Sequence, residues 1–169
     1  MSTAALSVRA VRADEVGLVL DFIRELADYE RLTHQVTATR EDIHAALFGE
    51  RPYAQAVFGC IDDRPCGFAL FFHNFSTFLG KPGLYLEDLY VRPDARGRGL
   101  GSHMMAWLAR LALDRGCGRF EWAVLDWNEP ALKVYRSLGA RAADDWTIHR
   151  ITGEALVRLA AKAGVESSG

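Results

Sequence analysis

The sequence has few cysteines and no excess of charge of one sign. Its three cysteines, Cys60, Cys66 and Cys117, are an odd number without the spacing of a disulfide framework or a zinc site. We therefore interpret them as small buried residues of a reducing compartment. The formal net charge of −2 gives no electrostatic reason to expect nucleic-acid binding. The five histidines show no metal-ligand spacing, and no metal is expected.

Long apolar runs are also missing. The longest, residues 66–72, is far too short to cross a bilayer, and residues 1–12 lack the apolar core of a signal peptide. We therefore expect a cytoplasmic protein with no membrane anchor. No repeat, low-complexity tract or change of composition divides the 169 residues. This predicts one domain over residues 1–169, with 164–169 as a flexible tail.

Hydrophobic periodicity predicts strands that alternate with helices. Strands are expected at residues 6–10, 54–61, 66–73, 85–91, 119–124 and 146–152. A turn is expected at residues 62–65. Helices are expected from Asp14 past residue 26, and at 39–49, 99–115, 128–138 and 153–162. This order of elements predicts an α/β domain in which a mixed sheet has helices on both sides.

The strongest local signal is a glycine-rich run that opens one of these helices. Residues 96–101 read Arg-Gly-Arg-Gly-Leu-Gly, and glycine lets a backbone approach a ligand closely. The N–H groups of such a loop, at the positive end of a helix, can form a nest for a pyrophosphate. No lysine follows as in a P-loop, and Ser102 stands where a dinucleotide fingerprint needs glycine. A turn that only joins a strand to a helix is the alternative.

Polar side chains stand out in two further segments. Glu87 and Asp88 are adjacent in an expected strand whose other residues are apolar on both faces. Because burial of charge is costly, one of them should point into a polar cleft, unless either caps a turn or pairs with an arginine. Tyr135 and Asn128 belong to the helix expected at 128–138. Taken alone, they are a core aromatic residue and a helix cap.

Together, in their order and separations, these segments resemble the GNAT acetyltransferase superfamily along nearly the whole chain. They are most similar to its spermidine/spermine (diamine) acetyltransferase branch. The resemblance rests on residues 24–30, 85–91, 96–101 and 127–130, and on Tyr135. It implies the GNAT fold, with a mostly antiparallel sheet, and a homodimer. It also implies transfer of an acetyl group from acetyl-CoA to a primary amine of a small cationic, polyamine-like acceptor.

The same resemblance implies roles for particular residues. Tyr135 would protonate the departing thiolate, and Glu87 would face the amine. The acetyl-CoA site would comprise Leu89, Tyr90, Val91, Arg96, Gly97, Arg98, Gly99, Leu100, Gly101, Ser102, Asn128, Glu129, Pro130, Ala131 and Tyr135. The acceptor site would comprise Tyr29, Glu30, Glu87, Glu121, Trp122, Ala123 and Asp144.

These residue types suit the reaction. A primary amine with a pKa of about 10 must lose a proton before it attacks a thioester, which costs roughly 4 kcal/mol at neutral pH. Glu87 could accept that proton through water. The leaving thiolate has a pKa of about 8.5, so a phenol such as that of Tyr135 can protonate it.

The acceptor itself stays open at the level of sequence. Leu138 stands where the family has a basic residue, and the stretch after Gly139 is shorter than in the family. Both departures lie around the expected acceptor pocket. The alternatives are therefore an amino-acid side chain such as that of thialysine, a protein lysine, or a non-catalytic acyl-CoA-binding regulatory domain.

Overall fold

The computed structural model describes residues 4–163. These residues form two compact units divided between Asn128 and Glu129, and each unit is described by itself. Across residues 4–163, no helix combines the length and apolarity needed to cross a membrane. The same residues gather no group of three or more side chains that could hold a metal ion. That the whole chain is one domain stays a prediction.

The first unit is built on a five-stranded sheet in the order β1-β2-β3-β4-β5. The strands are β1 (Leu6–Ala10), β2 (Gln55–Ile61), β3 (Arg64–Ser76), β4 (Lys81–Val91) and β5 (Arg119–Trp122). The first four pair antiparallel, and β5 runs parallel to β4. Parallel neighbours need a crossover connection, and α3 (Leu100–Asp114) lies between these two in the chain. The mixed, mostly antiparallel sheet is thereby confirmed.

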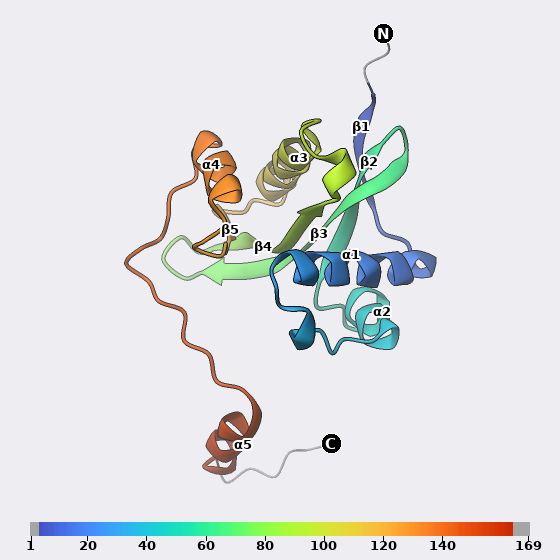
Figure 1. Ribbon diagram of the computed structural model, residues 1–169. Coiled ribbons are helices and arrows are strands. Elements are labelled where there is room, and N and C mark those ends of the chain that lie inside the picture. Colours follow the sequence, from blue (N-terminus) through green and yellow to red (C-terminus); the bar gives the residue numbers. More distant parts are fainter. Residues whose placement is uncertain (1–3, 164–169) are drawn as a thin grey trace. The chain divides into compact units, whose positions relative to one another are not determined.

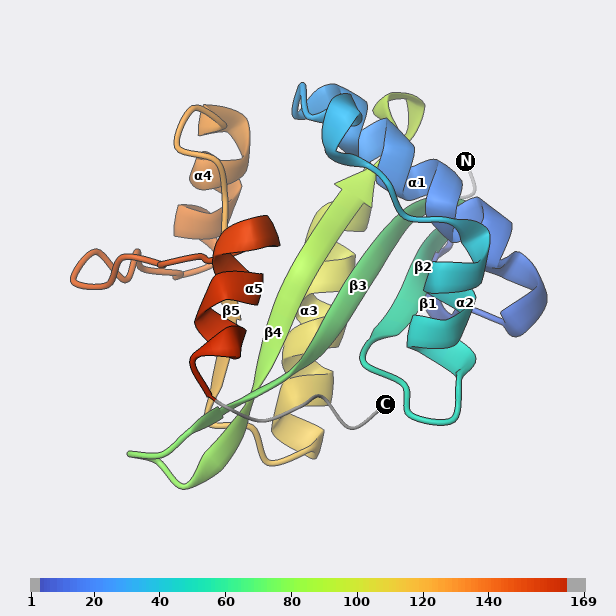
Figure 2. The same ribbon diagram turned by 90° about the horizontal axis from the view of Figure 1, so that it is seen from below.

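Helices cover both faces of this sheet, as predicted. In Figures 1 and 2, α1 (Val16–Tyr29) and α2 (Arg40–Phe48) lie on one face and α3 lies on the other. We call these the α1 face and the α3 face. Strand residues alternate between them: Phe58 packs against Phe22 of α1, whereas a side chain at Gly59 would meet Met104 of α3.

The β2–β3 hairpin is tighter than expected. Asp62 and Asp63 both have positive φ angles, 48° and 63°. Two consecutive residues of this kind make a type I′ turn, whose twist suits a two-residue hairpin. The turn therefore takes two residues instead of the expected 62–65, and β3 begins at Arg64.

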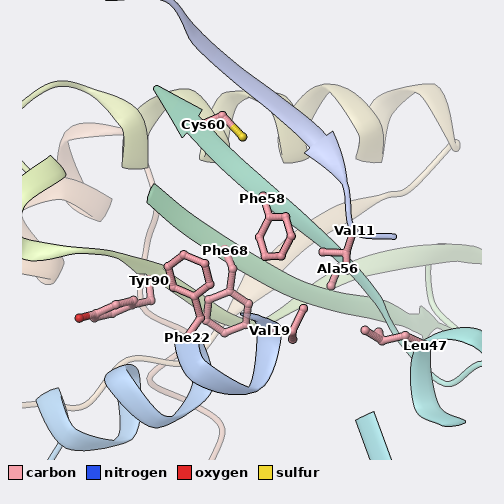
Figure 3. Packing of buried hydrophobic residues seen from close by; sticks show 9 residues of the cluster. All are labelled: Val11, Val19, Phe22, Leu47, Ala56, Phe58, Cys60, Phe68 and Tyr90. Atoms are coloured by element: carbon pink, nitrogen blue, oxygen red, sulfur yellow. The ribbon is translucent and has the colours of Figure 1, made fainter. Parts of the chain in front are cut away.

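The α1-face core fixes α1 across the carboxyl end of β4. Figure 3 shows the Phe22 ring of α1 among Phe58, Phe68 and Tyr90 of the sheet, with centroids 5.5–6.4 Å from its own. Arg92, just past β4, lies over the Phe22 ring at 4.4 Å and pairs with Glu25 at 2.8 Å. The C-terminal half of α1 is thus held beside the end of β4, and this placement matters for the site.

The second unit contains α4 (Glu129–Ser137) and α5 (Gly153–Ala161), close to the expected helices. The strand predicted at residues 146–152 is wrong, because this segment has no regular structure. A strand needs a neighbouring strand to complete its hydrogen bonds. Residues 129–163 contain no strand that could be this neighbour. None of these residues is buried either. The tail expected at residues 164–169 lies outside the described residues.

Candidate functional site

A β-bulge in β4 lies at the predicted catalytic carboxylate. Leu70 of β3 pairs with Asp88, but the next residue, Phe71, pairs with Leu86. Glu87 is therefore the extra residue of the bulge and has no partner in this register. Bulges bend a strand and redirect side chains, and they are frequent next to active sites. Nothing in the alternation of apolar residues in the sequence indicated this one.

The bulge gathers polar groups on the α1 face. Tyr90 belongs to the core under α1, so Asp88, two residues earlier, faces the same side. In a regular strand Tyr85 would lie on the opposite face from Asp88, but the extra residue brings both to the α1 face. Burial raises the pKa of both groups, and the charge of Glu87, which lies between them in the sequence of β4, raises both further. Two carboxyl groups and one phenol therefore share this part of the sheet.

Asp88 has a strongly perturbed pKa. Burial, together with the nearby charges of Glu87 and Glu30, raises its pKa from 3.8 to about 7. Glu30, at the end of α1, also has a pKa raised by burial. A carboxyl group that titrates near neutral pH suits proton transfer. The sequence drew attention to both acids but gave the catalytic role to Glu87, which is exposed.

Predicted acceptor residues of β5 divide between the two faces. Glu121 is the register neighbour of Tyr85 and lies with it on the α1 face. Trp122 is the neighbour of Leu86 and lies on the opposite face, and Ala123 follows the end of the strand. The α1 face thus brings Glu121 together with the acids of β4.

The glycine loop has a backbone conformation that favours glycine. Gly97 and Gly99 have φ angles of 73° and 82°, in the left-handed region that favours glycine. Gly99 is the N-cap of α3 and makes no side-chain cap. The first N–H groups of α3 have no acceptor within the helix. These N–H groups form the positive end of the helix dipole, where a bound anion is stabilised.

The two arginines of the loop differ. Arg96 donates from Nε to the Val91 carbonyl oxygen at 2.9 Å. Its guanidinium lies 5.0 Å from the ring centroid of Tyr29 and 5.5 Å from that of Tyr90. Arg96 therefore ties the loop to β4 and α1, whereas Arg98 is exposed.

Tyr29 also contacts the segment after β5. Its hydroxyl donates to Oδ1 of Asn128 at 3.4 Å, and its ring lies 6.1 Å from that of Trp127. The guanidinium of Arg31 lies 5.9 Å from the Trp127 ring. A predicted acceptor residue and a predicted cofactor residue are thus brought together. Trp127 had no role assigned from the sequence. In the structure it is 53% exposed, which is unusual for so large an aromatic residue.

The remaining predicted residues belong to the second unit. Glu129, Pro130 and Ala131 form the first turn of α4, and Tyr135 lies in its last turn. Gly139, with a φ angle of 86°, follows α4, and the Ala140 N–H donates to the Tyr135 carbonyl oxygen at 3.1 Å.

Asp144, also in this unit, lies in the exposed segment that follows α4. Tyr135 and Glu87 belong to different units, so their joint role stays a prediction.

Known proteins resemble the chain over most of its length. Residues 20–140 match the model of the acetyltransferase (GNAT) family. A thialysine N-epsilon-acetyltransferase of Sus scrofa is 39% identical, covering 94% of this chain and 99% of the relative. An L-ornithine N5-acetyltransferase of Arabidopsis thaliana is 28% identical, covering 88% and 85%. A solved integron cassette protein of V. cholerae has a TM-score of 0.75 at 29% identity, covering 92% of this chain and 97% of its own.

Proposed function

Because the chain belongs to the acetyltransferase (GNAT) family, it transfers acetyl groups to amines, and we propose that its acceptor is a small cation with a primary amine. One observation carries the proposal: Glu87 and Asp88 are adjacent at the β4 bulge, and Glu30 is near enough for its charge to raise the pKa of the buried Asp88 further. Three carboxyl groups in one place attract an ammonium ion. A polyamine or diamine meets this requirement, and so does an amino acid with a cationic side chain. Two relatives are named for amino acids with a side-chain amine.

The glycine loop fits the pyrophosphate of acetyl-CoA. Its left-handed glycines leave the backbone open, and the N–H groups at the start of α3 offer donors without internal acceptors. Arg98 adds an exposed positive charge, while Leu89 and Val91 of β4 offer backbone groups to the pantetheine arm. Further contacts with acetyl-CoA would come from Asn128 and from Glu129, Pro130 and Ala131, which follow it in the chain. Acetyl-CoA, when bound, supplies the activated thioester.

The carboxylate pair of β4 would prepare the amine. Deprotonating an amine at neutral pH costs roughly 4 kcal/mol, so an acceptor for the proton is needed close by. Glu87 is exposed at the bulge and can first attract the ammonium ion. Asp88, with a pKa of about 7, can hold the proton once it is released. The two residues together would then pass the proton from the amine towards water.

Tyr135 would act in the last step, by protonating the CoA thiolate that leaves. A phenol is normally protonated at neutral pH and can donate a proton to a thiolate, since a free thiol has a pKa of about 8.5. A positioned acid of this kind contributes roughly 10²–10⁴-fold to the rate. Backbone N–H groups of β4 beside the bulge would stabilise negative charge that develops on the acetyl oxygen.

The proposal is tested by following release of the CoA thiol with a panel of acceptors. The panel contains diamines, polyamines, lysine, ornithine and a lysine-containing peptide, with acetyl-CoA in excess. We expect release with small cationic amines and only background with the peptide. Faster release with the peptide would indicate a protein-lysine acetyltransferase. Tight acetyl-CoA binding without release for any amine would indicate a binding domain, and both results contradict the proposal.

The resemblance to the diamine acetyltransferase branch also supports a homodimer. We propose this state for the full chain in solution. Light scattering coupled to gel filtration measures it directly: the expected mass is twice 18.8 kDa. A single-chain mass across the working concentration range would contradict it.

A further inference from the structure

An ion pair on β5 lies on the same face of the sheet as the acids of β4. Nε of Arg119 is 2.6 Å from Oε1 of Glu121, and the two side chains are 40% and 39% exposed. Asn74 of β3 donates from Nδ2 to the same Glu121 oxygen at 3.1 Å. Gly83 leaves room for this arrangement, since a side chain there would meet Asn74 and Arg119. Both charges are therefore held against the sheet and remain open to solvent on one side.

The side-chain amide of Asn74 holds the Glu121 carboxylate of this pair through Nδ2. Its Oδ1 atom is buried and has no hydrogen-bond partner among the described residues. An orphaned buried acceptor is costly, and native proteins keep few of them. The cost is offset only in part by the single bond to Glu121. The orientation of Glu121 is thus set by an amide on the same face of the sheet, which is more than an incidental surface ion pair requires.

The register of the strands relates the ion pair to the proposed acceptor amine. Glu121 lies beside Tyr85, two residues before Glu87 on β4. Two steps along a strand and one step across put the Cα atoms of Glu87 and Glu121 about 8 Å apart. Tyr85 is therefore near both carboxylates: burial raises the pKa of its phenol, and the charges of Glu87 and Glu121 raise it further. The Tyr85 ring packs on Phe72 with centroids 5.2 Å apart, which gives an apolar floor between two charged ends.

We propose that the Arg119–Glu121 pair receives the α-carboxylate and α-ammonium groups of an amino-acid acceptor. The acceptor's side-chain amine would then reach Glu87 and Asp88 across the ring of Tyr85. The extended side chain of such an amino acid, with four or five bonds, spans about 5–6 Å. The side chains of the protein at its two ends span the rest of the distance between β5 and the acids of β4. This inference rests on the proposed function and narrows its acceptor class.

The charges distinguish an amino acid from a plain diamine. A carboxylate matches the planar, bidentate donors of Arg119, and the neighbouring ammonium matches Glu121. A diamine has no group for Arg119 and places a positive charge close to it. The ion pair would therefore bind the zwitterionic amino acid and repel the diamine. Specificity of this kind comes both from favourable contacts with one ligand and from unfavourable contacts with its competitor.

The test compares acceptors that differ only in the carboxylate. Lysine is paired with cadaverine and ornithine with putrescine, and kcat/KM is measured for each with the wild type, Arg119→Gln and Arg119→Lys. For the wild type we expect the amino acid of each pair to be favoured. Arg119→Gln should lower the ratio of amino acid to diamine about tenfold or more, mainly through KM, because a charged hydrogen bond is lost. Arg119→Lys keeps the charge and should restore part of the ratio.

Arg110→Gln is the matched control, since it removes an exposed arginine from an ion pair on α3 with Asp114. It should leave both ratios unchanged. Ratios that Arg119→Gln does not change, or a wild type that prefers the diamines, would overturn this inference while leaving the acetyltransferase function intact. Failure of the wild type to acetylate any acceptor would overturn the proposed function first, so the two failures are distinguishable.

Discussion

Replacement of Asp88 by asparagine tests whether the β4 bulge holds a carboxyl group that is costly to ionise. The pKa of Asp88 is raised from 3.8 to about 7 by burial and by Glu87 and Glu30. The folded protein therefore binds this proton more tightly than the unfolded chain does. Since the unfolded chain releases the proton first, the free energy of unfolding should fall as pH rises from about 4 to about 7.

The size of the effect follows from the two pKa values. At roughly 1.4 kcal/mol per pKa unit, a rise from 3.8 to about 7 corresponds to about 4 kcal/mol. Water reaching the partly buried carboxyl group lowers this value, so about 4 kcal/mol is an upper bound. Asp88→Asn keeps the shape and removes the ionisation. We expect the variant to gain about 1–3 kcal/mol over the wild type near pH 8, and to gain little near pH 4.

Urea denaturation of both proteins, at several pH values between about 4 and 8, measures this difference. Asp21→Asn, at an exposed position of α1, is the control and should follow the wild type. The same variant should lose acetyl transfer, since asparagine cannot hold the proton. Parallel stability curves for the wild type and Asp88→Asn would refute the reasoning, because they would show that Asp88 ionises in the folded protein at no cost.

Three further predictions concern other parts of the chain. Tyr135→Phe should lower kcat about 10²-fold or more with little change in acetyl-CoA affinity; wild-type turnover would remove Tyr135 from the mechanism. Gly99→Val should abolish acetyl-CoA binding in calorimetry, because valine is strained at a φ angle of 82° and the loop must shift; unchanged affinity would contradict the loop assignment. Glu15→Gln should lower the free energy of unfolding at neutral pH by about 1–2 kcal/mol in urea titrations, since the hydrogen bond from partly exposed Arg9 lowers the pKa of Glu15 to about 2. That contribution is present above the ordinary pKa of 4.5 and is lost as pH falls towards 2, so a variant equal to the wild type at neutral pH would count against it.

Local chemistry in the sequence was enough to predict the glycine loop and most elements of the first unit. A helix start depends on neighbouring residues alone: the glycine-rich run was expected to open a helix, and Gly99 is the N-cap of α3. The apolar strands around Phe58 and Phe68 are also local patterns, and they fold into the core that their periodicity implied.

The features that could not be predicted depend on partners distant in the chain. The bulge at Glu87 exists only in the register between β3 and β4, which no single strand encodes. The raised pKa of Asp88 comes from burial and from nearby charges, which include Glu30, 58 positions earlier at the end of α1. The segment 146–152 shows the reverse case: its residues suit a strand, but a strand forms only where another strand is available to pair with it.

The proposed reaction moves an acetyl group from acetyl-CoA to the side-chain amine of a small cationic acceptor. Mass spectrometry of ornithine incubated with the protein and acetyl-CoA tests it most directly. We predict a product heavier by one acetyl group, with fragmentation that places the group on the side-chain nitrogen, and formation of this product about 10²-fold more slowly in Tyr135→Phe. Unmodified ornithine, lysine and diamines in the presence of bound acetyl-CoA would contradict the account.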